Sequence, residues 1–159
     1  MSDTIPLAAF QEALLRLVEE TFQQVHGIYL DRGTSLFETL APVTAEVASR
    51  RVAPTCACLA AQVEHVAFYL EVAARYARGE EFGRIDWDAA WRRTGATPEE
   101  WAALQERLRA AHRGVLDLLG DEATFRDERA LGGAMAIVAH TAYHLGEIRQ
   151  ALGVLAAQP

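Results

Sequence analysis

Two histidines stand four residues apart near the end of the sequence, in the stretch AHTAYHLGEIRQAL. On an α-helix, His140 and His144 are separated by about 40° around the axis and by one turn along it, so their imidazoles are neighbours. Ile137 and Ile148 lie on the same side of this helix, which therefore faces the core. Because neutral imidazole is a preferred ligand of zinc, nickel, copper and iron, the pair has the chemistry of a metal site.

A third histidine, His65, is predicted to point inward from an earlier helix, in the stretch AAQVEHVAFYL. It shares the apolar side of that helix with Val72. The charged residues of the same helix form a separate arc that is expected to face solvent: Glu64, Glu71, Arg75 and Arg78. Three inward histidines on two helices can converge on one cation and leave a coordination position open for water or substrate, as in catalytic zinc sites. The alternative is structural, since a single buried histidine is more often a hydrogen-bonded core residue.

Three further side chains are candidate catalytic residues because of their positions beside these histidines. Glu147 follows His144 by about one turn, where a carboxylate is a fourth ligand, an acceptor that orients an imidazole, or a solvated residue at a cavity mouth. Tyr69 and Tyr143 flank the same positions. A phenol there either donates a proton to a reacting group or only packs against the rings.

Helical periodicity and end signals predict four long helices, over residues 5–25, 55–78, 97–119 and 129–156. Thr97-Pro98-Glu99-Glu100 has the sequence of a capping box with proline in the first turn. A second capping box, Ser35 to Glu38, predicts a short helix within the long first connection. No useful strand-like alternation occurs, so the expected fold is all-α, a four-helix bundle with a long first crossover in one domain over residues 1–159.

Other aromatic and histidine residues have simpler expected roles. Residues 80–96 are predicted to be a loop in which Trp87 and Trp91 cover the edge of the core. His26 is expected to interact with the last carbonyls of the first helix. His112 lies among charged residues and is expected to be solvated.

Composition excludes several classes of partner. The chain has 159 residues, a formal net charge of −7 and no lysine among its 15 basic residues, so neither nucleic acid nor an anionic membrane surface is an expected partner. The sequence contains no run of about 18 apolar residues, so no membrane span is expected. The N-terminal stretch MSDTIPLAAFQEALL lacks the pattern of a secretory signal. Cys56 and Cys58 are two residues apart, a spacing that does not favour a mutual disulfide on a helix and fits a reducing cytoplasm. Cys58 is also about 10 Å of helical rise from His65, too far to share an ion with it.

The order of elements and two motifs resemble the DinB-like (DinB/YfiT) superfamily of bacterial four-helix bundles. AHTAYHLGEIRQAL resembles that family's HxxxH followed by a glycine and an arginine, and AAQVEHVAFYL resembles its second-helix segment with the first metal histidine. The resemblance covers nearly the whole chain. It implies that His65, His140 and His144 bind a divalent metal ion, zinc or nickel, with water completing the shell. Glu147 departs from the pattern, because glutamine is common there.

The resemblance also limits the expected functions. Some relatives are metal-dependent transferases that use low-molecular-weight thiols, others are thought to be hydrolases or isomerases, and members are often homodimers. We therefore expect a metal-dependent enzyme acting on a small molecule, either a transferase that uses a low-molecular-weight thiol or a hydrolase. Two alternatives stay open at this point: a non-catalytic metal- or ligand-binding bundle related to stress, and a member whose histidines only form hydrogen bonds.

Overall fold

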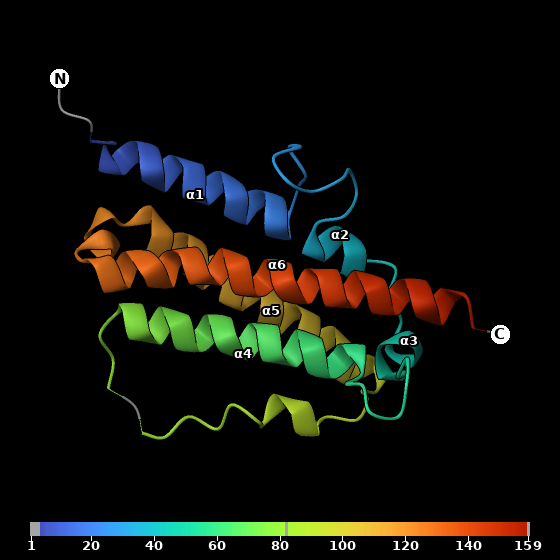
Figure 1. Cartoon of the computed structure of the whole chain (residues 1–159). Helices are drawn as coiled ribbons and strands as arrows, with labels where there is room; N and C mark the ends of the chain where they lie inside the picture. Colours follow the sequence, from blue (N-terminus) through green and yellow to red (C-terminus); the bar gives the residue numbers. More distant parts are fainter. Residues whose placement is uncertain (1–3, 82, 159) are drawn as a thin grey trace.

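A computed structural model describes residues 4–81 and 83–158, so the first three residues of the N-terminal stretch considered above lie outside it. Its four long helices are α1 (Leu7–Phe22), α4 (Leu59–Ala77), α5 (Pro98–Gly120) and α6 (Glu128–Ala156) (Figure 1). The described residues form helices, turns and loops and contain no strand, which confirms the all-α prediction. None of the helices in this part of the chain combines the length and hydropathy needed to cross a membrane.

The connections contain four short helical segments. The first crossover contains α2 (Leu36–Leu40) and α3 (Ala45–Ser49), and two 3₁₀ turns, η1 (Ala90–Arg92) and η2 (Glu122–Phe125), lie before and after α5. Both predicted capping boxes are present, at the start of α2 and at the start of α5. In each box the N-cap hydroxyl and the glutamate three residues later satisfy two amides that the first helical turn leaves without partners.

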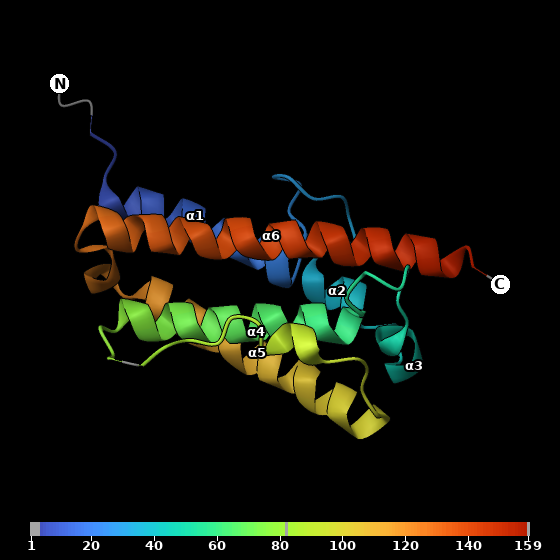
Figure 2. The same cartoon turned by 60° about the horizontal axis from the view of Figure 1, so that its bottom comes forward.

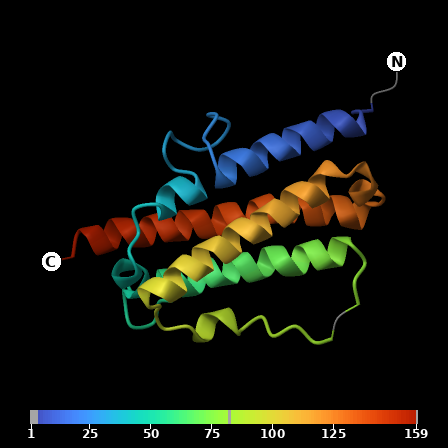
Figure 3. The same cartoon turned by 180° about the vertical axis from the view of Figure 1, so that it is seen from behind.

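Helix α6 lies between α1 and α4, and both α4 and α1 also pack on α5 (Figures 1 and 2). Seen from behind, α5 crosses the other helices obliquely (Figure 3). The residues that fill the space between them are almost entirely aliphatic, among them Leu70, Leu108, Leu145 and Ile148. The segment between α4 and α5 runs along the outer side of α4, where η1 contacts that helix (Figure 1).

Two predicted helix boundaries were wrong by several residues, and backbone hydrogen bonds explain the difference. Helix α4 begins at Leu59 rather than Thr55 because the amide of Cys56 donates to the carbonyl of Ala53 at 3.0 Å, which forms a turn after Pro54. Cys58 is therefore the N-cap of α4 rather than a residue within it. The first helix spans 7–22 rather than 5–25.

The cause of the early end of α1 is Glu20, which is fully buried. Its carboxylate accepts hydrogen bonds of 2.6–2.9 Å from four backbone amides: His26, Ile28, Tyr29 and Leu30. Burial by itself would raise its pKa, but the amide of Tyr29 and then the other three outweigh that effect and lower the pKa to about 2. The chain turns at Gly27, whose φ of +81° favours glycine, and wraps around the carboxylate.

The structure also corrects two histidine predictions. His112 is only 3% exposed, not solvated, and its ring stacks on Phe22 with the centroids 4.6 Å apart. Burial, with the charges of Arg113 and Arg109, lowers its pKa to about 4, so it is neutral at pH 7. His26 pairs with the carboxylate of Glu19, Nε2 to Oε2 3.2 Å, on the surface.

Glu20→Gln tests the role of this buried carboxylate. The neutral amide leaves amide donors poorly paired, so we expect the free energy of unfolding at pH 7 to fall by roughly 2–3 kcal/mol. Because the folded-state pKa is depressed, the contribution of Glu20 is complete above about pH 4.5 and disappears as the pH falls towards 2. Urea denaturation at pH 7 and at pH 3 to 4 should therefore show a smaller difference between the two proteins in acid. Glu12→Gln, which removes an exposed carboxylate from the same helix, is the control. Equal effects of the two substitutions would contradict this role.

Candidate metal centre

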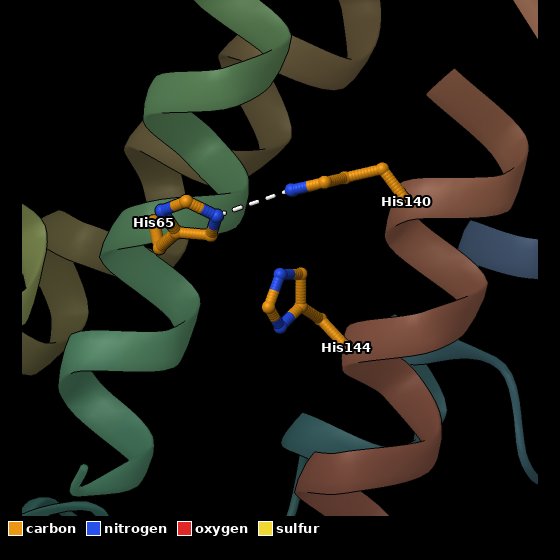
Figure 4. A group of neighbouring side chains, drawn as sticks. All are labelled: His65, His140 and His144. Atoms are coloured by element: carbon orange, nitrogen blue, oxygen red, sulfur yellow. Dashed lines mark hydrogen bonds between the residues drawn. The ribbon is translucent and has the colours of Figure 1, made fainter. Parts of the chain in front are cut away.

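The packing of α4 against α6 brings His65, His140 and His144 together, as predicted (Figure 4). One ligand nitrogen from each imidazole lies within 4.8 Å of the other two. The closest pair is Nε2 of His65 and Nε2 of His140, 3.1 Å apart. Within the described part of the chain, these three side chains are close enough together to hold one metal ion.

The cluster is largely removed from water, with His65 and His144 9% and 5% exposed. Burial, followed by the influence of His144, lowers the pKa of both His65 and His140, the latter to about 4. Both rings are therefore neutral at pH 7, which is the form that binds a cation. The Nδ1 atoms of His65 and His140 are buried and have no hydrogen-bond partner within the described residues.

His144 differs from the other two because a carboxylate orients it. Its Nδ1 is 2.8 Å from Oε2 of Glu147, which leaves Nε2 available to the centre of the cluster. Glu147 also accepts a hydrogen bond from the hydroxyl of Tyr143, and this bond raises the pKa of Tyr143. Tyr143 is 63% exposed, with its ring edge against His144. Of the three roles considered for Glu147, the geometry favours that of an acceptor that orients an imidazole.

Aromatic rings cover the two remaining histidines. The ring of Tyr69 lies flat on His140, with centroids 3.6 Å apart and an interplanar angle of 11°, and burial raises the pKa of this phenol. Trp91 stacks on His65 at 4.3 Å, while Trp87 contacts Tyr69 at 6.4 Å. The sequence predicts both tryptophans at the edge of the core, but it does not connect Trp91 with the histidines, because no local spacing relates a loop residue to a helix packed beneath it.

The segment that carries Trp91 is attached to α4 by polar contacts. The guanidinium of Arg93 forms an ion pair with Glu64, next to His65 in sequence, and donates to the carbonyl of Gly95 at 3.2 Å. Glu64 is only 23% exposed, so its predicted place on a solvent-facing arc was wrong. The buried thiol of Cys58 points at the carbonyl of Arg93, 3.7 Å away, and takes no part in the histidine cluster.

The match to known families agrees with this arrangement. Residues 29–148 match the sequence model of the DinB superfamily, and the matched region contains all three histidines. The chain therefore belongs to the DinB superfamily. Comparisons with curated proteins and with solved structures give no match.

Glu64→Gln should loosen the segment over the histidines without unfolding the protein. The substitution removes the partly buried charge that holds Arg93, so we expect faster tryptic cleavage at Arg84 and a loss of about 1 kcal/mol or less in global stability. Limited proteolysis followed by mass spectrometry would locate the cleavage. Glu106→Gln, which breaks an exposed ion pair with Arg113, is the control. Unchanged cleavage in Glu64→Gln would mean that apolar packing alone holds the segment.

Proposed function

We propose that His65, His140 and His144 hold one divalent cation, zinc or nickel, and that the chain is a metal-dependent enzyme. The reaction we propose is transfer to a low-molecular-weight thiol or hydrolysis of a small molecule. The observation that carries the proposal is the convergence of three imidazoles on one point from two helices. When bound, the cation would lower the pKa of a thiol or water at its open position and so supply a nucleophile at neutral pH.

The residues present fit such a cation. Two nitrogens bound to tetrahedral zinc are roughly 3.3 Å apart if each bond is about 2.0 Å long. The 3.1 Å separation of the Nε2 atoms of His65 and His140 is close to that value. Without a cation, a single proton would have to bridge these two nitrogens, and Nε2 of His144 would face them without a donor of its own. A cation satisfies all three lone pairs at once.

The residues around the cluster support different parts of the proposed chemistry. Glu147 holds Nδ1 of His144 and so fixes the tautomer that presents Nε2. Tyr69 and Tyr143 keep their protons at neutral pH, because their pKa values are raised, so each is a candidate proton or hydrogen-bond donor to a substrate and neither is a base. The cytoplasmic location expected from the two cysteines stays a prediction, and so does the homodimer implied by the resemblance.

Metal content tests the site directly. We expect about one equivalent of zinc or nickel in untagged protein, and none in the His140→Ala/His144→Ala variant, because two of three ligands are gone. Elemental analysis after incubation with either metal gives the measurement. His26→Ala removes a surface histidine and should keep its metal. Absence of metal from the wild-type protein after incubation would show that the histidines are structural.

Glu147→Gln should weaken metal binding without abolishing it. The amide is a poorer acceptor for the Nδ1–H of His144, so we expect affinity to fall roughly 10- to 100-fold. Competition with a chelator of known affinity measures the change. Glu128→Gln makes the same substitution on α6, away from the cluster, and is the matched control. A loss no larger than that of the control would argue against the orienting role.

Turnover separates an enzyme from a protein that only binds metal. Metal-loaded wild-type protein should catalyse thiol transfer or hydrolysis in a substrate screen, and His140→Ala should lose at least 100-fold in rate while keeping its helical circular dichroism spectrum. Equal rates in the two proteins would exclude catalysis at this cluster.

A further inference from the structure

A cavity lies between α4 and α6, next to the histidine cluster. Its volume is about 590 Å³, within the size range of small-molecule sites, and its walls come from both helices and from the segment that carries Trp87. Tyr69 is a wall that the cavity shares with the cluster, because its ring lines the cavity and also lies on His140. Ile137, one turn before His140 on α6, lines the cavity as well.

The side walls of the cavity are apolar and aromatic. The aliphatic positions come from facing turns of the two helices: Val72, Ala73 and Ala77 on one, Ala130, Ala134 and Ile137 on the other. Among the described residues, the aromatic side chains of these walls are Tyr69, Tyr76 and Trp87. Tyr76 and Trp87 are 51% and 42% exposed, which is a large aromatic area to leave in contact with water. Such walls suit the apolar or aromatic body of a ligand.

Charged side chains line the end of the cavity at the start of α6. Arg126 and Arg129 line this end together with two carboxylates, Glu80 and Asp127. Glu80 is already paired with Arg75 and Arg78, at 2.9 and 3.5 Å. Asp127 is the N-cap of α6, and its Oδ1 accepts a hydrogen bond of 2.8 Å from the amide of Ala130. Its Oδ2 lies 3.8 Å from Nε of Arg126.

Arg129 is the cation at this end that the carboxylates do not neutralise. Its guanidinium lies 6.0 Å from the ring centroid of Tyr76, and within residues 4–81 and 83–158 no carboxylate lies within ion-pair distance of it. A guanidinium has a fork of donors that matches a carboxylate or a phosphate, so an unneutralised arginine at the end of an apolar cavity is suited to a ligand's anionic group.

We infer that this cavity binds an amphipathic organic anion, with its apolar or aromatic body between α4 and α6 and its anionic group on Arg129. Arg129 and His140 are eleven positions apart on α6, roughly 16 Å along the axis, so an extended ligand can reach from the arginine towards the cluster. That this anion is the substrate rests on the proposed metal-dependent function. Its binding does not, because none of the cation-binding nitrogens lines the cavity.

Calorimetric titration with 6-phenylhexanoate and with the uncharged 6-phenylhexan-1-ol tests the inference. We expect chelator-treated wild-type protein to bind one equivalent of the carboxylate more tightly than the alcohol. Arg129→Gln should weaken binding of the carboxylate about tenfold and leave the alcohol unchanged. Arg149→Gln, an exposed position further along α6, should change neither. Equal affinity of the wild-type protein for acid and alcohol, or no binding of the acid, would overturn the assignment.

A pair of glycine substitutions tests the location. Gly133 lines the cavity, and a Cβ added there meets no atom within 4 Å, so Gly133→Leu should fold and place its side chain in the cavity. It should abolish binding of both probes. Gly132→Leu has equally open surroundings but does not line the cavity, so it should bind both normally. Undiminished binding in Gly133→Leu would place the probes elsewhere. Probe binding by metal-free protein would support this inference independently of the metal proposal. Metal binding without probe binding would refute this inference and leave the metal proposal standing.

Discussion

The contact between α4 and α6 is the constraint on which the site depends. It places three imidazoles in an interface that is otherwise aliphatic, and a buried polar ring is costly unless its nitrogens have partners. One histidine, His144, finds such a partner in Glu147. The other two face each other at 3.1 Å and have stacked aromatic rings on their exposed sides. In the proposed function, a cation at the centre would accept one lone pair from each of the three rings.

Unlike the histidines of the cluster, Glu20 is a buried charged group whose carboxylate has hydrogen-bond partners. Four amides converge on its carboxylate, so the first crossover is organised around a point charge rather than around an apolar cluster. His112 shows a third solution, in which a buried imidazole stays neutral and stacks on Phe22. The chain therefore contains buried titratable groups of three kinds: one fixed as an ion, one fixed as a neutral ring, and a cluster suited to a cation.

The cavity and the cluster are neighbours between α4 and α6, and Tyr69 contributes to both. Two arginines lie at one end, apolar walls follow, and the histidines lie beyond Tyr69. If the proposed function holds, this order suits a substrate whose anionic group is bound far from the reacting atoms, so that binding energy from the remote group positions the reactive end. The segment with Trp87 and Trp91 borders both regions, since one tryptophan lines the cavity and the other stacks on His65.

The sequence by itself determined the helical class, the helices with strong end signals and the inward direction of the three histidines. These are local properties: Thr97 and Glu100 cap α5 from within four residues, and His140 and His144 share a helix face through their spacing alone. Only the tertiary structure decided the early end of α1, the burial of His112, the ion pair of Glu64 with Arg93 and the stacking of Trp91 on His65. Each of these depends on a partner distant in sequence or on a loop that folds back, and periodicity contains no information about which segment will supply that partner.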